Sequence, residues 1–217
     1  MVIYWNYESS TCEGTYGPNG QNQSGATFRA AYLHSDFALV ELEDDLTENM
    51  CLSFLGWDRS GNVPTEGTTI HHPSADVMKI SFDEDQLIET SKGENSGDYF
   101  WKVDWDIGAT ENVSSGAPLF DQNKRVVGQL AGGESECGGD DMRDWYGCFY
   151  RSWTGGGTSS TRLADWLGFG YTTLNTIRPE GIITGPWQVC SDDVDFTLQN
   201  APEGSSVKWT AAYVTPS

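Results

Sequence analysis

A serine in a tight turn is the residue of this sequence best placed for covalent chemistry. Ser115 is followed by Gly-Ala-Pro, a short apolar stretch, a polar turn and a β-branched stretch from Arg125 to Leu130. This order predicts a hairpin with the serine at its mouth. A nucleophilic serine needs such an exposed turn, with backbone N–H groups pointing to where an oxyanion would form. The other interpretation is an ordinary Ser/Gly-rich hairpin turn.

The elements around this turn are predicted to be strands. Short apolar stretches between turn residues run through the chain, which is typical of an all-β protein. Trp101, Val103 and Trp105 alternate with polar residues, so a half-buried strand should lead into the serine turn. The predicted strands are 2–7, 27–33, 37–42, 52–57, 68–72, 77–82, 100–106, 125–130 and 145–153.

One helix is predicted near the end of this β region. It follows the glycine run 155–157, and Ser160 or Thr161 can cap it. After residue 180, short alternating strands begin again, as at the start of a β-sandwich. We therefore expect a first domain over residues 1–180 and the beginning of a second module over residues 181–217.

Composition and charge exclude several classes of function. The formal charge of −20 argues against binding to nucleic acid or to anionic membranes. No apolar stretch is long enough to span a bilayer. The five cysteines form no Cys-x-x-Cys pair, which argues against a zinc site, and no metal or cofactor is expected. The cysteines are compatible with a secreted, disulfide-bonded protein, although an odd count leaves at least one of them unpaired.

The serine turn is one of a series of motifs along the chain. In chain order they are Tyr-Trp-Asn-Tyr at 4–7, Ser-Asp-Phe-Ala-Leu-Val-Glu-Leu at 35–42, Gly-Trp-Asp-Arg at 56–59, Ile-His-His-Pro at 70–73, Ser-Gly-Ala-Pro-Leu at 115–119, Gly-Gln-Leu at 128–130, Asp-Trp-Tyr-Gly at 144–147 and Ser-Trp-Thr-Gly-Gly-Gly at 152–157. In this order and spacing, residues 2–170 resemble lysyl endopeptidase, the bacterial lysine-specific group of the trypsin-like serine proteases. Beyond residue 183 the chain is similar to the immunoglobulin-like modules that follow such proteases in some secreted bacterial proteins.

The resemblance implies a fold and a catalytic apparatus. The fold is a chymotrypsin-like pair of six-stranded β-barrels with the active site between them, here lacking its first strands. Ser115 matches the nucleophile, and Asp36 matches the aspartate that orients the catalytic histidine. The N–H groups of Val113 and Ser115 match the oxyanion hole.

The resemblance also implies the contacts with substrate. Asp144 matches the carboxylate at the base of the primary specificity pocket, where a lysine ammonium would bind. Asp140 and Asp141 are nearby alternatives, and a solvated acidic loop is the other interpretation. The strand edge that pairs with the substrate backbone in the family is matched by Leu130, Ala131 and Gly132.

The sequence departs from the family at the general base. The family's catalytic histidine lies in a His-Cys dipeptide upstream of the first strand, and this sequence does not contain that dipeptide. His71 and His72 match a motif that is not catalytic. The partners of Cys12 and Cys137 are expected in the same upstream region. We therefore expect a truncated chain with both of these thiols free and with no triad-dependent proteolysis.

Two further departures concern the site itself. Val113 stands where the family has glycine, and its Cβ is expected to disturb the oxyanion hole. Ala131 stands where lysyl endopeptidase has a histidine that shapes the active site.

The sequence thus predicts a monomeric, secreted serine endopeptidase that cuts polypeptides after lysine or another basic residue through an acyl-enzyme. The alternative is a catalytically inactive, protease-like binding module of a multi-domain secreted or cell-surface protein, which Val113 and the missing histidine favour. A carbohydrate-binding β-sandwich, suggested by the nine tryptophans, is a third interpretation, but most tryptophans in strands fall at core positions.

Overall fold

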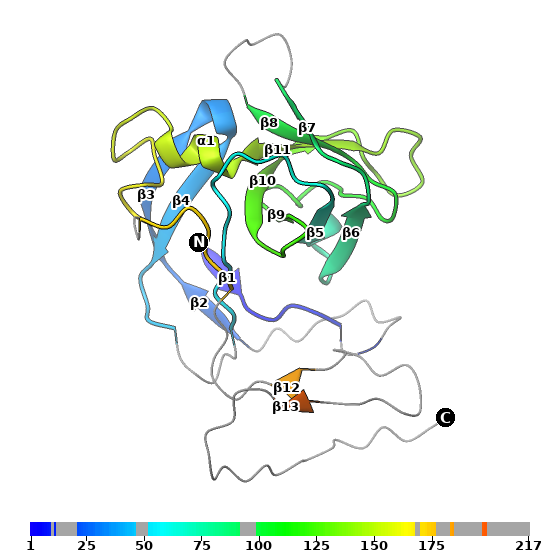
Figure 1. Ribbon diagram of the computed structural model, residues 1–217. Helices are drawn as coiled ribbons and strands as arrows, with labels where there is room; N and C mark the ends of the chain where they lie inside the picture. The colour runs from blue at the N-terminus through cyan, green and yellow to red at the C-terminus, as the bar shows by residue number, and fades with distance from the viewer. Residues whose placement is uncertain are drawn as a thin grey trace.

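Antiparallel strands are the main regular secondary structure among the described residues of the protein in a computed structural model (Figure 1). The structure describes residues 1–9, 11, 21–46, 52–91, 99–167, 170–176, 183–184 and 197–198. The elements in chain order are β1 (Val2–Tyr4), β2 (Asn22–Ser24), β3 (Ala26–Tyr32), the short helix η1 (Leu33–Ser35), β4 (Phe37–Leu42), β5 (Gly67–His71), the short helix η3 (Pro73–Ala75), β6 (Lys79–Asp83), β7 (Ile88–Thr90), β8 (Phe100–Asp104), β9 (Pro118–Phe120), β10 (Val126–Gly133), β11 (Arg143–Cys148), α1 (Phe149–Thr154), β12 (Ile183–Thr184) and β13 (Thr197–Leu198).

The strands nearest the N-terminus form two separate antiparallel pairs. β1 pairs with β2, and β3 pairs with β4 around a bulge between Phe28 and Ala30. β3 and β4 agree with the predicted strands 27–33 and 37–42 to within a residue. Helix η1 connects them, so the predicted site residue Asp36 lies at the point where the chain enters β4.

Seven strands form one curved sheet in the order β6-β5-β9-β10-β11-β8-β7. β6, the first strand of this order, also forms hydrogen bonds with the segment that follows β8. Phe82 N–H donates to the Ile107 carbonyl at 2.9 Å, and Asp106 N–H donates to the Phe82 carbonyl at 3.0 Å. The sheet therefore curls round toward a barrel, as the right-hand half of Figure 1 shows. The predicted all-β class is confirmed.

An aromatic core fills the inside of the curved sheet. Trp101 and Val103 are each 1% exposed and Trp105 is 4% exposed, so the alternation predicted for this strand is confirmed and its inner face is completely buried. The indole N–H of Trp101 donates to the Val127 carbonyl at 3.0 Å, which satisfies the polar atom of this buried ring. The facing strands contribute Leu119, Val127, Leu130 and Tyr146. This core holds together the strands that flank the serine turn.

The helix lies earlier than the sequence predicted. α1 covers Phe149–Thr154, so it overlaps the second half of the segment predicted as a strand over 145–153. Its buried residues Phe149, Ser152 and Trp153 have the spacing of one helical face. These side chains lie in a second core, which joins α1 to the β3–β4 pair and consists of Ala30, Phe37, Trp57, Phe149, Trp153 and Leu163.

The segment predicted as the helix forms a single turn instead. Within residues 160–167, Leu167 N–H donates to the Leu163 carbonyl at 2.9 Å. The Leu163 N–H donates back to the Ser152 carbonyl of α1 at 3.0 Å, so this segment is tied to the helix that precedes it. The prediction of a strand over 52–57 is also wrong, because this stretch forms only isolated bridges, such as that of Trp57 with Val126.

Few of the described residues belong to the predicted second module. β12 pairs with β13, and the rest of residues 181–217 lies outside the described residues, so the immunoglobulin-like module stays a prediction. Cys137 and Cys148 are free, the first exposed and the second buried, and no disulfide joins described residues. Cys12, Cys51 and Cys190 lie outside the described residues. Among the described residues, the helices are too short to cross a membrane.

Candidate active site

The serine turn lies between β8 and β9. Its backbone reverses tightly, because Ser114 N–H donates to the Glu111 carbonyl at 3.1 Å. Gly116 N–H donates to the Leu130 carbonyl at 2.8 Å, which fastens the turn to β10. The side chain of Ser115 is exposed, as a nucleophile for an external substrate must be.

Two amides in this turn have no partner. In the part of the chain that the structure describes, neither Val113 N–H nor Ser115 N–H makes a hydrogen bond, whereas the N–H groups of Ser114 and Gly116 do. The two free donors are those predicted for the oxyanion hole. The turn holds both donors in place, as an oxyanion hole would require.

Val113 adopts a backbone conformation that favours glycine. Its φ is +75°, which costs a residue with a Cβ about 1–2 kcal/mol. Two hydrogen bonds from Ser74 hold the chain just before it. The Ser74 N–H donates to the Asn112 carbonyl at 2.7 Å, and its hydroxyl donates to the Glu111 carboxylate at 2.6 Å. The valine side chain is 66% exposed and projects into solvent. Val113 thus takes the conformation expected of a glycine at this position.

Asp36 is positioned by the residue before it. Ser35 is completely buried. Its carbonyl accepts a hydrogen bond from Gln129 Nε2 at 2.6 Å, and its Oγ accepts one from Ser152 Oγ at 2.9 Å. These bonds hold η1 against β10 and α1. Asp36 itself is exposed and has a φ of +47°, and no hydrogen bond joins it to Ser115 within the described residues.

Gly147 on β11 completes this contact, which we call the η1 seam (Ser35, Gln129, Gly147 and Ser152). A Cβ at Gly147 would lie 1.7 Å from the Ser35 carbonyl oxygen, so only glycine lets η1 approach β11 this closely. Residue type and spacing alone did not indicate that these four residues position Asp36. The available signal was that each of them falls inside one of the motifs that carry the resemblance.

Asp144 lies inside the curved sheet and is 1% exposed. Its Oδ2 accepts hydrogen bonds from Trp105 Nε1 at 2.6 Å, Thr110 Oγ1 at 2.7 Å and Ser135 Oγ at 2.8 Å. Its Oδ1 has no hydrogen-bond partner. Gly133 of β10 leaves room for this oxygen, because a Cβ there would lie 1.9 Å from it. A buried carboxylate with one unpaired oxygen is costly unless a donor or a cation binds there.

The two alternative aspartates are in different surroundings. Asp140 is exposed, and Asp141 pairs with Arg143, whose Nε donates to it at 2.7 Å. This hydrogen bond lowers the pKa of Asp141 to about 2. Of the three candidates, Asp144 alone combines burial with an unpaired oxygen.

The predicted substrate-binding edge lies on β10 beyond the end of β9. β9 pairs with β10 only as far as Gln129. A bulge opposite β11 falls between Leu130 and Gly132, so Ala131 is its extra residue. Leu130 is bonded to the serine turn through both of its backbone groups. From Ala131 onward, the edge of β10 that faces away from β11 has no strand partner among the described residues.

Within the described residues, no histidine hydrogen-bonds to Ser115. His71 is buried and its Nδ1 lies 2.9 Å from Ser114 Oγ. His72 Nδ1 donates to the carbonyl of the residue that follows η3 at 3.0 Å. His34 is exposed, and its ring packs edge-on against a tyrosine of β3.

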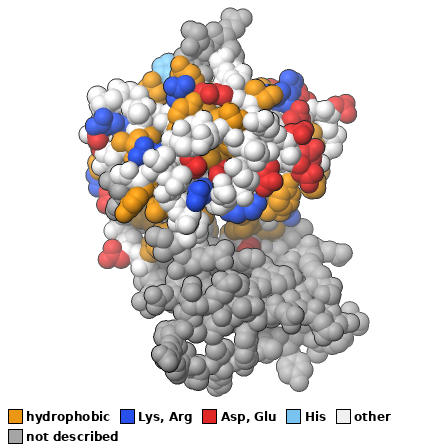
Figure 2. All heavy atoms as spheres, viewed as in Figure 1, with side chains coloured by type: hydrophobic (Ala, Val, Ile, Leu, Met, Phe, Trp, Pro, Cys, Tyr) orange, Lys and Arg blue, Asp and Glu red, His pale blue; other side chains and the backbone are white. Residues whose placement is uncertain are grey.

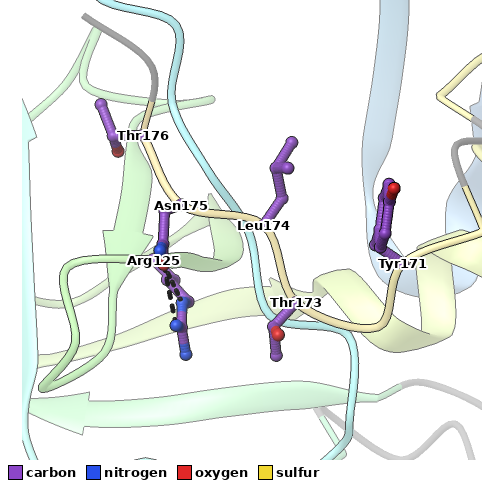
Figure 3. A pocket seen from close by; sticks show the side chains of 6 residues that line it. All are labelled: Arg125, Tyr171, Thr173, Leu174, Asn175 and Thr176. Atoms are coloured by element: carbon purple, nitrogen blue, oxygen red, sulfur yellow. Dashed lines mark hydrogen bonds between the residues drawn. The ribbon is translucent and has the colours of Figure 1, made fainter.

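An open pocket of about 390 Å³ lies away from these residues (Figure 3). Arg125 donates from Nε at 3.1 Å and from Nη2 at 2.8 Å to Asn175 Oδ1 on one side of it. Because Arg125 immediately precedes β10, this pocket is at the opposite end of that strand from the predicted substrate edge. Its lining consists of Arg125, Tyr171, Thr173, Leu174, Asn175 and Thr176.

Acidic side chains gather on the side of the molecule formed by the curved sheet (Figure 2). Asp83, Asp85 and Asp106 place carboxylate oxygens within 4.8 Å of one another. Both carboxylate oxygens of Asp83 already accept hydrogen bonds from backbone N–H groups, one from Asp85 at 3.0 Å and the other from Asp104 at 2.9 Å. Burial raises the pKa of Asp83. Because the Asp83 carboxylate is already hydrogen-bonded to the backbone of neighbouring segments, we assign no metal to these three residues.

Comparison with known proteins identifies a family. The model of the lysyl endopeptidase C-terminal domain family matches residues 1–147. Two solved structures, both of inactive forms of the protease Rv3671c, one of them from M. tuberculosis H37Rv, are similar over part of the chain. One has 18% identity and a TM-score of 0.36 and covers 62% of this chain and 63% of that chain. The other has 19% identity and a TM-score of 0.36 and covers 57% of this chain and 60% of that chain. The chain thus spans less than two thirds of either structure.

Proposed function

This chain belongs to the lysyl endopeptidase C-terminal domain family, and on that premise we propose that it is the protease domain of a secreted, monomeric serine endopeptidase that cuts polypeptides after lysine or another basic residue. Ser115 is its nucleophile, Asp36 orients the general base, and Asp144 selects the side chain before the cut.

The reaction is acyl transfer through Ser115. Its Oγ attacks the scissile carbonyl carbon while its proton passes to a histidine base, which in the family lies upstream of the first strand. The oxyanion that forms accepts hydrogen bonds from the N–H groups of Val113 and Ser115. Collapse of this intermediate breaks the C–N bond, and the leaving amine takes the proton. Water then attacks the acyl ester, which releases the acid and restores the serine. We assign the base to neither His71 nor His72, because both rings are engaged elsewhere.

The observation that carries the specificity is the unpaired Oδ1 of Asp144. Three donors hold Oδ2 and fix the carboxylate, which leaves Oδ1 for a donor from outside. A lysine ammonium would supply both charge and hydrogen bonds, whereas a neutral side chain would leave the carboxylate desolvated and unpaired. A compact ammonium also suits an enclosed site better than a planar guanidinium, so we expect lysine to be preferred over arginine.

A second function is a protease-like binding module without catalysis. The observation that favours it is that no described histidine hydrogen-bonds to Ser115. In this case the β10 edge and Asp144 would still bind a basic peptide, but Ser115 would not react.

The test is the binding of peptides that end in lysine or in norleucine, which has the same chain without the charge, measured by titration calorimetry. We expect the lysine peptide to bind at least about 30-fold more tightly, because an unpaired buried charge costs about 2 kcal/mol or more. Asp144→Asn should remove this preference, and Asp141→Asn, the matched surface control, should keep it. Equal binding of the two peptides, or equal effects of the two variants, would refute the assignment of Asp144.

A further inference from the structure

We propose that His71, on β5, is a positioning residue that holds the oxyanion turn in place through the hydroxyl of Ser114. This role deepens the proposed function and rests on it, since it gives a task to a buried side chain beside the reacting serine.

His71 connects three segments of the chain. Its ring is 2% exposed. Nδ1 lies 2.9 Å from Ser114 Oγ in the serine turn, and Nε2 lies 3.3 Å from Ser81 Oγ on β6. Ser114 is itself 3% exposed, so water does not compete for these polar atoms.

The hydrogen atoms available fix the direction of each bond. The Ser81 hydroxyl donates its single hydrogen to the Ala109 carbonyl at 3.1 Å, so Ser81 Oγ must accept from His71 Nε2–H. A neutral imidazole carries one hydrogen, so Nδ1 is an acceptor and the Ser114 hydroxyl donates to it. Ser114 Oγ in turn accepts the Glu111 N–H at 3.4 Å. Every polar hydrogen in this chain of bonds therefore has an acceptor.

The position of Ser114 explains why this matters for catalysis. It lies between Val113 and Ser115, whose N–H groups are the proposed oxyanion donors. Holding its side chain restrains the peptide that carries the Ser115 N–H. An imidazolium would turn a second N–H toward the Ser114 hydroxyl, which would lose its acceptor and have to rotate.

Burial favours the neutral form of the His71 ring. Burial is the main cause that lowers the pKa of His71, and the neighbouring His72 lowers it further. The carboxylates of Asp144 and Glu111 act in the opposite direction but do not reverse the shift. The neutral ring required by the bond directions is therefore the favoured form.

Two variants of similar size separate the two ends of the imidazole. In His71→Asn, the amide oxygen can occupy the place of Nδ1 and accept from Ser114, but contact with Ser81 is lost. In His71→Gln, the amide reaches the place of Nε2 and contacts Ser81, but Ser114 loses its acceptor. Both variants remove the ring, so any general loosening of the core should be common to them.

The measurement is hydrogen exchange of the Ser114, Gly116 and Ala117 amides, with the Lys124 amide in the turn between β9 and β10 as the internal control. We expect His71→Gln to speed exchange of the first three by about fivefold or more, since a lost hydrogen bond frees the turn. His71→Asn should leave the exchange rates of these three amides close to those in the unmodified protein, and the exchange rate of the control amide should be the same in both variants. Equal effects of the two variants would overturn the proposal.

The tautomer provides a second test that needs no variant. Nitrogen NMR of the unmodified protein at neutral pH should show the His71 proton on Nε2, and a proton on Nδ1 would overturn the proposal. Neither measurement depends on proteolysis. If lysine peptides showed no preference while these two results held, the proposed specificity would fail and the positioning role would stand.

Discussion

Gly147→Ala should open the η1 seam and displace Asp36. The added Cβ would lie 1.7 Å from the Ser35 carbonyl oxygen and 2.4 Å from Gln129 Nε2, whereas Cβ contacts are essentially never shorter than 3.0 Å. Gly147 lies on β11 and Ser35 in η1, and the first of these contacts is with backbone. The two elements must therefore separate by well over an ångström.

The cost follows from what this separation breaks. The Gln129 bond to the Ser35 carbonyl (2.6 Å) and the bond between the Ser152 and Ser35 hydroxyls (2.9 Å) would both be lost. Each contributes about 1 kcal/mol, and overpacking itself costs about 1–3 kcal/mol. We expect the free energy of unfolding to fall by about 3 kcal/mol or more, which corresponds to a drop in Tm of about 6–12 °C for a chain of this size.

Denaturant unfolding and calorimetry check this expectation. Gly138→Ala is the control, because a Cβ there meets nothing within 4 Å and the change tests only the positive φ of +79°. Gly138→Ala should lower the free energy of unfolding by about 1–2 kcal/mol. If Gly147→Ala is no more destabilising than Gly138→Ala, close packing at the η1 seam is not what holds Asp36, and the reasoning is wrong.

Three further predictions concern buried groups. Burial lowers the pKa of His71 below its usual value of 6.5, so between the lowered pKa and 6.5 the unfolded chain binds more protons than the folded one. The free energy of unfolding should therefore fall as the pH drops through this window. Denaturant titrations of His71→Asn should show a smaller fall. The free energy of unfolding of Asp144→Asn should stay within about 1 kcal/mol of that of the unmodified protein, because the amide oxygen can accept hydrogen bonds from the same three donors. In the same assay, Asp144→Ala should lower the free energy of unfolding by about 3 kcal/mol or more. Exposed Cys137 should react with a thiol reagent in the native protein, and Cys148, whose pKa burial raises, should react only after unfolding; equal rates would contradict the buried position of Cys148.

The strands could be predicted where one face enters a core. Trp101 and Val103 of β8 and Trp105 just after it point into the core at every second position, which matches their alternation with polar residues in the sequence. The helix could not be placed in the same way, since α1 follows β11 directly and its N-cap residue, Cys148, makes no side-chain capping bond that would mark the boundary. The local signals of a helix were the spacing of Phe149 and Trp153 and the glycine at its C-terminus, Gly155.

The candidate site could likewise be predicted from the sequence only in part. Ser115 and Asp144 could be proposed from residue type and motif, because the relevant chemistry belongs to single side chains. The η1 seam could not, because Gln129 and Ser35 are 94 residues apart. The role of His71 depends likewise on a serine 43 residues away, so that only the folded chain shows the contact.

The most direct test of the account is cleavage-site profiling of the protein in the longest form that its gene encodes, with Ser115→Ala as the control. A mixture of unfolded proteins would be digested and the new termini identified by mass spectrometry. The account predicts lysine or arginine before nearly every cut and no cuts with Ser115→Ala. Cuts that persist without Ser115, or that show no enrichment of basic residues, would contradict it.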